Sequence, residues 1–198
     1  MQLLPRHRLE ELTESGELGI EPLLDPQNQI GEVSIDLRLG YDFLVSVFTR
    51  NPTIDLAEPN VIRKSIGTHF QSTRRDLGDT FVLYPNQVVI GTTLEYISLP
   101  NNVSMEVNPR SSYSRLGLHA NSFTQPGYRG CSSLELINLG NIPVKLLIGS
   151  RILQARFFEH ATSSNYHNKY RKYIASVRPI ASKADGDEDL FRLRKRRD

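Results

Sequence analysis

Residues 87–107 read QVVIGTTLEYISLPNNVSMEV, which is two strand-like runs with a turn between them. The runs cover 87–99 and 103–107, and the Pro-Asn-Asn at 100–102 is typical turn chemistry. Similar runs recur at 41–48, 80–84, 132–137, 142–148 and 151–158, again separated by short turns. Many short strands with almost no helix predict a mainly β fold, either a distorted antiparallel barrel or a double-sheet jelly roll.

The segments flanking this core add one helix and one strand. Residues 5–15 predict a short amphipathic helix, because Leu9 and Leu12 are three residues apart and Gly16 follows as a stop signal. Residues 33–39 alternate between apolar and polar types, which predicts a half-buried strand that Gly40 ends. The stretch 51–79 is polar and interrupted by prolines, so we expect an irregular excursion from the sheet.

Length and charge favour one domain with a separate tail. A chain of 198 residues can bury one full core, and we predict a single domain over 1–180 and a charged, flexible tail over 181–198. The last seven residues carry five positive charges and one negative charge, so the rest of the chain is slightly acidic. That balance argues against a general nucleic-acid-binding role. A solvated tail is the favoured reading, with a polyanion-binding tail or a terminal helix docked on a neighbouring subunit as alternatives.

Several classes of protein are excluded by what the sequence lacks. No stretch approaches the roughly 18 to 20 apolar residues of a membrane helix, and the first residues do not resemble a secretory signal, so we expect a cytoplasmic protein without membrane contact. A single cysteine, Cys131, and five scattered histidines offer no zinc-ligand spacing, so we expect no zinc. The Walker A loop, the G-x-G-x-x-G turn and the G-x-S-x-G elbow are all missing.

The densest polar cluster outside the tail is the segment from Arg110 to Leu118. Arg110 and Arg115 lie five residues apart, with the hydroxyls of Ser111 and Ser112 beside them. Guanidinium groups, hydroxyls and free backbone N–H groups at a turn suit a phosphate group. The alternative is a solvated turn, which is the more common origin of such a segment.

Glu135 is a second candidate, placed between Leu134 and Leu136 in a strand-like run. If both leucines face the core, Glu135 points outward as a surface carboxylate. If it faces a pocket, desolvation would raise its pKa and make it a competent proton shuttle. The Pro-Gly turn that follows Gln125 predicts a hairpin connection.

Taken together and in this order, the motifs resemble the deoxycytidine triphosphate deaminases of the dUTPase-like superfamily. The matching segments are Ser34 to Gly40, Tyr84 to Gln87, Thr92 to Glu95, Arg110 to Leu118, Pro126 to Gly130, Leu134 to Asn138 and Ile152 to Gln154. The resemblance implies a distorted barrel or jelly roll and a homotrimer with active sites between subunits. It also implies a deoxynucleoside triphosphate substrate, with Mg²⁺ bound through the triphosphate and no metal ligand from protein side chains.

The resemblance also assigns roles to individual residues. Arg110, Ser111, Ser112 and Arg115 match the block that contacts the phosphates and orders the catalytic water. Glu135 matches the carboxylate that takes a proton from water attacking C4 of cytosine and delivers protons to N3 and the leaving ammonia. Tyr166 and Lys169 resemble a closing segment that folds over the triphosphate, with Lys169 pairing to phosphate. The implied reaction is zinc-independent hydrolytic deamination of dCTP to dUTP, a step of nucleotide metabolism.

Three departures from the family pattern keep other functions open. The loop between Leu118 and Pro126 is about three residues shorter than in the family, Gln125 replaces an aspartate that binds the deoxyribose 3′-hydroxyl, and Tyr173 replaces a glutamine. Gln125 can accept that hydrogen bond but cannot act as a base. The alternatives are a nucleotide-binding or regulatory paralogue without turnover and a dUTPase-like cleavage of the triphosphate. Inhibition by dTTP is a further open question.

Overall fold

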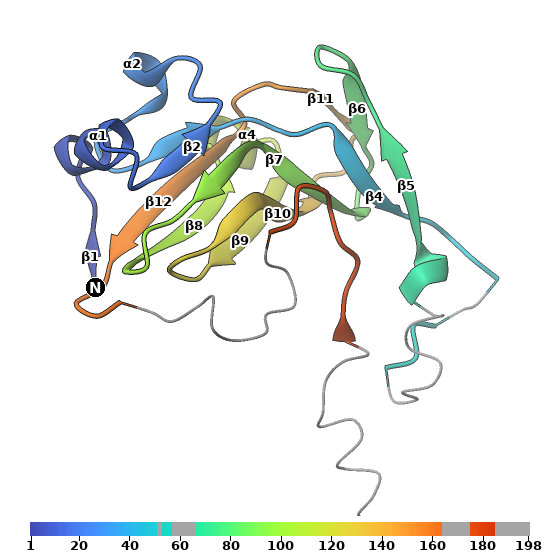
Figure 1. The fold of residues 1–198 in the computed structure, drawn as a ribbon. Coiled ribbons are helices and arrows are strands. Elements are labelled where there is room, and N and C mark those ends of the chain that lie inside the picture. The colour runs from blue at the N-terminus through green and yellow to red at the C-terminus, as the bar shows by residue number, and fades with distance from the viewer. Residues whose placement is uncertain (51–52, 57–65, 164–174, 185–198) are drawn as a thin grey trace, which may run out of the picture.

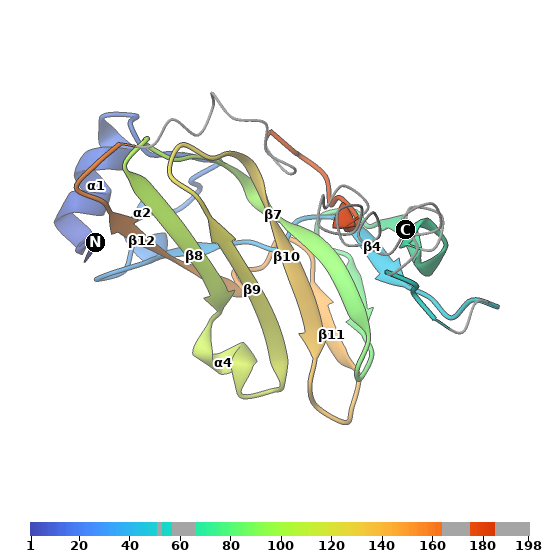
Figure 2. The same ribbon diagram turned by 90° about the horizontal axis from the view of Figure 1, so that it is seen from below.

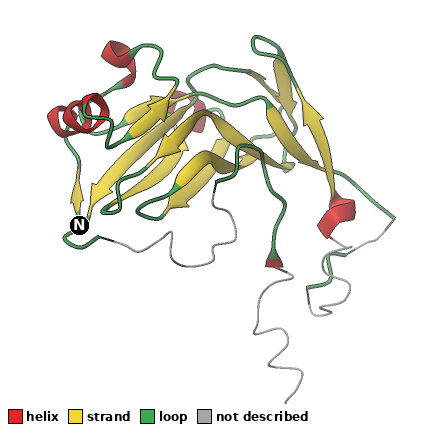
Figure 3. Ribbon diagram, viewed as in Figure 1, coloured by secondary structure: helices red, strands yellow, loops and turns green. Residues whose placement is uncertain are grey.

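The computed structural model describes residues 1–50, 53–56, 66–163 and 175–184. β-Strands are the predominant secondary structure of these residues, with short helices at the edges (Figure 3). The helices are α1 (Arg6–Glu14), α2 (Pro26–Gln29) and α4 (Ser111–Ser114), and residues 66–69 form a further helical turn. The strands are β1 (Gln2–Leu3), β2 (Gly19–Glu21), β3 (Ile35–Leu37), β4 (Asp42–Ser46), β5 (Phe70–Arg74), β6 (Thr80–Leu83), β7 (Val88–Ser98), β8 (Val103–Pro109), β9 (Leu118–Thr124), β10 (Arg129–Asn138), β11 (Val144–Leu147) and β12 (Leu153–Glu159).

The strands form one large sheet and one small sheet. The large sheet runs β1-β12-β8-β9-β10-β7-β4-β5, with β3 added beside β12 and β2 beside β7, and β6 pairs with β11 in the small one. All these pairings are antiparallel. The mainly β, jelly-roll-like prediction is therefore confirmed. The large sheet begins at β1 and ends at β5, so the described strands do not close a barrel.

One hydrophobic core fills the space between the sheets and α1. Leu9 and Leu12, which α1 turns inward, are 0% and 2% exposed, as their spacing predicted. Phe43 of β4 stacks on Phe81 of β6 with the ring centroids 4.3 Å apart, which joins the small sheet to the large one. Figure 1 shows α1 and α2 at one end of the sheet and β5 and β6 at the other. Among the described residues, none of the helices has the length and apolar composition needed to cross a membrane.

Besides the short β1 and β2, two longer strands lie where the sequence predicted none. β5 falls in the stretch 51–79, which was expected to be irregular, and this expectation was wrong for residues 70–74. Its residues are largely exposed, so they show no apolar alternation, and pairing with β4 defines the strand instead. β9 is held between β8 and β10; its inward side includes the polar Ser122 and Thr124 while Phe123 faces outward, so residue type did not follow the alternation. Figure 2 shows α4 at the turn that joins β8 to β9.

Candidate active site

Glu135 lies on the face of β10 that points away from the core. Leu134 and Leu136 are both 0% exposed, whereas Glu135 between them is exposed. The outward orientation that the alternation predicted is therefore correct, and it places the carboxyl in a cavity rather than on a flat surface. The cavity walls withdraw water from the carboxyl, and this desolvation raises its pKa above the ordinary value. Glu135 thus points away from the core and also lines a cavity.

We call this hollow the carboxylate cavity. Its volume is about 430 Å³, within the range of small-molecule sites. The strands β7, β9 and β10, the loop between β9 and β10, and the segment 175–184 supply its lining, which is Ile90, Asn121, Ser122, Phe123, Thr124, Gln125, Tyr128, Ser133, Glu135, Ile180 and Ser182. Apolar side chains alternate with hydroxyl, amide and carboxyl groups. Such a mixture suits a flat heterocycle with polar edges. Gln125 and Glu135, both singled out from the sequence, share this cavity.

The segment 175–184 forms one wall of the carboxylate cavity. The N–H of Ala175 donates to the carbonyl of Arg129 at 2.8 Å, and the N–H of Cys131 donates to the carbonyl of Ser176 at 2.8 Å. These bonds seat the segment along the start of β10 (Figure 1, red). Ile180 and Ser182 then line the cavity. Ser182 belongs to the residues that the sequence assigned to the tail, and Tyr166 and Lys169 of the expected closing segment lie outside the described residues, as does Tyr173.

Gly130 permits this close approach. A Cβ at this position would lie 2.7 Å from the carbonyl oxygen of Ser176 and 3.0 Å from the hydroxyl of Tyr128, and φ is +143°. Any residue other than glycine at position 130 would strain the backbone and push the segment 175–184 away. The glycine of the Pro-Gly-Tyr-x-Gly motif therefore has a packing role in addition to its turn role.

Arg110, Ser111, Ser112 and Arg115 gather at a second hollow, which we call the cradle cavity. Its volume is about 480 Å³, and its lining is Asn28, Gln29, Gly31, Ser34, Asp36, Arg110, Ser111, Ser112, Arg115 and Gln154. The two serines begin the single turn of α4, and Arg110 precedes it in extended conformation. The structure thus brings together the four residues that the sequence grouped as a phosphate cradle. The side chain of Arg115 has no hydrogen-bond or ion-pair partner among the described residues, so its guanidinium is open to an anion.

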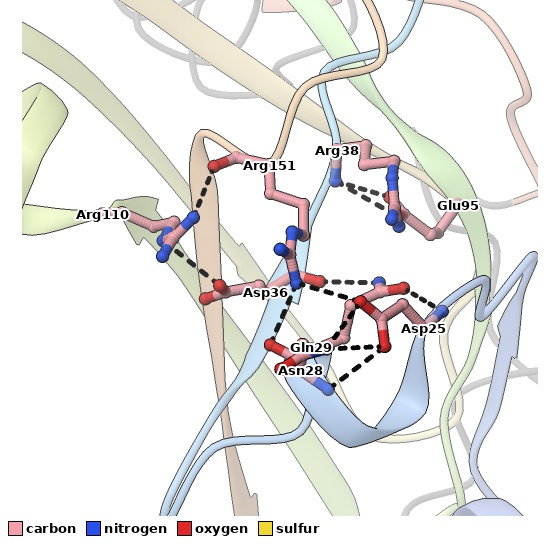
Figure 4. Close-up of polar contacts among 8 residues, drawn as sticks. All are labelled: Asp25, Asn28, Gln29, Asp36, Arg38, Glu95, Arg110 and Arg151. Atoms are coloured by element: carbon pink, nitrogen blue, oxygen red, sulfur yellow. Dashed lines mark hydrogen bonds and ion pairs between the residues drawn. The ribbon is translucent and has the colours of Figure 1, made fainter.

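Arg110 is held in place by a network behind it (Figure 4). Its Nε lies 3.2 Å from Oδ2 of Asp36, and its Nη1 donates to the carbonyl of Arg151 at 3.0 Å. The Nη1 of Arg151 donates to the carbonyl of Asn28, and the amide of Gln29 donates to the carbonyl of Asp36. Through these contacts α2 and β3 fix the direction of the Arg110 side chain.

Asp36 is a site residue that the sequence reading missed as such. It is only 9% exposed, and burial raises the pKa of its carboxyl while Arg110 and Arg151 act in the opposite direction. Asp36 occupies a polar position of the alternating pattern at 33–39, which predicted a half-buried strand with this side chain outward; this was wrong for β3, because all three of its residues are buried. Asp36 neutralises part of the positive charge of Arg110, so Arg115 is the less compensated cation of the cradle cavity.

A second buried carboxylate, Glu95, has a structural role. It is 0% exposed, accepts two hydrogen bonds from the N–H of Arg38 at 2.9 and 3.1 Å, and lies 3.4 Å from the Nη1 of Arg38 (Figure 4). Desolvation is the largest influence on its pKa, which is raised. These contacts join β7 to the end of β3, which accounts for two of the motifs recognised in the sequence.

The carboxylate cavity and the cradle cavity are separate within one chain. Their linings share no residue. Glu135 therefore lines one cavity and Arg115 lines the other.

The chain is similar to known proteins over most of its length. A family model described as dCTP deaminase-like matches residues 3–160. A dCTP deaminase of Haloarcula marismortui is 38% identical over 183 residues, covering 89% of this chain and 92% of the relative. A dUMP-forming dCTP deaminase of Methanobrevibacter smithii is 32% identical over 197 residues, covering 96% of this chain and 99% of the relative.

The solved structures include one related fold of the same description. The 2′-deoxycytidine 5′-triphosphate deaminase from Agrobacterium tumefaciens superposes with a TM-score of 0.59 at 27% identity. The match covers 79% of this chain and 46% of that one, so this chain spans about half the length of the solved protein.

Proposed function

The chain belongs to the dCTP deaminase-like family, and on this basis we propose that it hydrolytically deaminates dCTP to dUTP and ammonia. The observation that carries the proposal is Glu135, a carboxyl of raised pKa in a cavity lined by apolar and hydrogen-bonding groups. A base with a pKa moved toward neutrality both accepts and returns protons efficiently. The reaction is a hydrolysis of the C–N bond of a cyclic amidine.

In the proposed mechanism Glu135 moves every proton of the reaction. Its carboxylate takes a proton from water as the oxygen attacks C4, and the electron pair of the C4–N3 double bond moves to N3, which Glu135 protonates. Glu135 then removes the proton from the new hydroxyl and delivers it to the amino group. The C4–N4 bond breaks, ammonia leaves and C4 becomes a carbonyl. Protonation at N3 makes C4 more electrophilic, so a pocketed carboxylate can act here without zinc.

Arg110, Ser111, Ser112 and Arg115 are proposed to bind the triphosphate. Charge-assisted bonds from guanidinium groups and hydroxyls suit phosphate oxygens. Asp36 is the one carboxylate among the described residues that line the cradle cavity, and it is paired to Arg110. No group of three or more His, Cys, Asp or Glu side chains that could hold a metal occurs in the described part of the chain. The guanidinium and hydroxyl groups of the cradle cavity fit a triphosphate that carries its own Mg²⁺. The ion then offsets part of the phosphate charge.

We further propose that the site is completed between copies of the chain in a homotrimer. The separation of the two cavities supports this arrangement, because the cradle of one copy could then face Glu135 of the next. Phe123 on the outward face of β9 is 56% exposed in the single chain, which is consistent with a covering subunit. Mixing inactive Glu135→Gln with inactive Arg115→Ala protein tests this directly. Recovery of activity on subunit exchange supports shared sites, and no recovery after demonstrated exchange contradicts them.

A dUMP-forming reaction is the second candidate, because several of the relatives carry that description at 32 to 36% identity. Chromatographic product analysis with Mg²⁺ and dCTP, dUTP or CTP in separate reactions distinguishes the candidates. We expect dUTP from dCTP, and loss of that product in Glu135→Gln. Formation of dUMP would establish phosphate cleavage as well. Binding of dCTP or dTTP without turnover would identify a regulatory nucleotide-binding protein. We place the reaction in the cytoplasm because its substrate is a soluble nucleotide.

A further inference from the structure

Asn121 lies directly opposite Glu135 in the sheet. The two residues are Cα partners in the antiparallel pairing of β9 with β10. Both are exposed and both line the carboxylate cavity, since their neighbours Ala120 and Leu136 are buried on the opposite face. Directly opposed residues of an antiparallel pair have Cβ atoms roughly 4.5 to 5.5 Å apart. Two such side chains can reach adjacent atoms of one small ring.

The carboxamide of Asn121 is not engaged by any other described residue. It has no hydrogen-bond partner within the residues that the structure describes. Its neighbours differ, because Ser122 pairs with Ser132 at 3.0 Å and Thr124 donates to the carbonyl of Met105 at 3.3 Å. Asn138 at the end of β10 shows what a structural asparagine looks like here, since its amide donates to two carbonyls and accepts from the N–H of Gly140. Asn121 stands free beside the reactive carboxyl.

We propose that Asn121 is a catalytic residue that binds the two substituents at C4 of the pyrimidine. This role rests on the proposed function. In the substrate C4 is planar and carries one amino group, which can donate to Oδ1 of Asn121. When water adds, C4 becomes tetrahedral and carries an oxygen as well, to which Nδ2 of Asn121 can donate. The two substituents on one carbon match the oxygen and the nitrogen on one carboxamide carbon.

The second hydrogen bond forms only after water attacks C4, so Asn121 stabilises the transition state more than it stabilises the bound substrate. An interaction that is gained in the transition state lowers the barrier, whereas one present from the start only strengthens substrate binding. Donors aimed at a developing oxyanion contribute about 10²- to 10³-fold to kcat. An amide suits this position because it is uncharged. A second carboxylate beside Glu135 would raise the pKa of Glu135 further and hold it protonated.

Steady-state kinetics on the full chain with dCTP and Mg²⁺ tests the role. We expect Asn121→Ala to lower kcat by about 10²-fold, because the bond to the added oxygen is lost, and to raise KM by no more than about 10-fold, because the bond to the amino group is lost as well. Asn121→Asp keeps an acceptor but loses the donor, so its kcat also falls, and the acid limb of its pH profile moves to higher pH. The matched control is Asn101→Ala, an exposed asparagine in the turn after β7 that lines neither cavity, and it leaves both constants unchanged.

Two further measurements distinguish a wrong role for Asn121 from a wrong proposed function. Melting temperature and affinity for inorganic tripolyphosphate verify that Asn121→Ala still folds and keeps its cradle cavity. If the wild-type chain turns over dCTP and folded Asn121→Ala retains its kcat, the role of Asn121 is refuted and the proposed function stands. If the wild-type chain binds dCTP but does not turn it over, the proposed function is refuted, and the catalytic role of Asn121 with it.

Discussion

Replacing Gly130 by alanine should detach the segment 175–184 from the sheet. The added Cβ would lie 2.7 Å from the carbonyl oxygen of Ser176, closer than a carbon atom tolerates, and φ at this position is +143°. The carbonyl belongs to the backbone, so the overlap cannot be relieved by turning a side chain. We expect the segment to move away from β10 rather than the buried strand to shift.

The size of the effect follows from the bonds that the movement breaks. Two backbone hydrogen bonds of 2.8 Å hold the segment to residues 129 and 131. At about 0.5 to 1.5 kcal/mol each, their loss amounts to about 1 to 3 kcal/mol. Since every 1.4 kcal/mol changes an equilibrium tenfold, the open state should gain about 5- to 140-fold in population. Ile180 and Ser182 would then leave the carboxylate cavity, and KM for dCTP should rise.

Hydrogen exchange measured peptide by peptide is the appropriate assay. The amides of Cys131 and Ala175 should exchange faster in Gly130→Ala, while the central residues of β8 and β12 keep their protection. Gly16→Ala is the control, because it places alanine at φ +77° with no heavy atom within 4 Å of the new Cβ. It introduces backbone strain far from the cavity without the overlap. Unchanged exchange at Cys131 and Ala175 in Gly130→Ala would refute the reasoning.

Four other predictions concern the reaction and the tail. Arg115→Ala should weaken triphosphate binding and lose turnover, measured by calorimetry and product analysis, and unaltered affinity and rate would exclude the cradle. Glu135→Gln should abolish turnover with nucleotide affinity largely intact, and comparable activity would reject Glu135 as the proton shuttle. Because the base acts ionised and its pKa is raised, kcat/KM should increase with pH through a value above the ordinary 4.5, and a profile that falls over that range would contradict the role. Removing residues 192–198 should abolish any salt-sensitive binding to nucleic acid, and binding that persists would show that the tail is not responsible for it.

The same pKa shift makes a prediction for stability. The folded pKa of Glu135 lies above the unfolded one, so the carboxyl is best tolerated when protonated, at pH below about 4.5. As pH rises through the raised pKa, ionisation in the cavity becomes a cost to the folded state. Glu135→Gln should therefore melt at the same temperature as the wild type in acid and at a higher temperature at neutral pH. A difference that narrows with rising pH would show that desolvation does not control this carboxyl.

Local pattern in the sequence determined much of the fold. Residues 6–14 form the expected helix, and the strands β4, β6, β7, β8, β10, β11 and β12 lie in the runs that apolar patterning and turn residues marked out. The burial of Leu134 and Leu136 and the outward direction of Glu135 also follow from alternation alone. These features depend on neighbours within a few positions, which a periodicity of two or 3.6 residues records.

Tertiary structure alone decided how these pieces meet. Asn121 lies beside Glu135, Asp36 lies behind Arg110, and Ser176 rests on Gly130, and each pair joins residues at least 14 positions apart in the chain. The separation of the carboxylate cavity from the cradle cavity is of the same kind. Such contacts depend on the register and order of strands in the whole sheet, and no local periodicity encodes them. The sequence by itself identified the residue types for the chemistry, and the packing of the sheet determined which of them share a cavity.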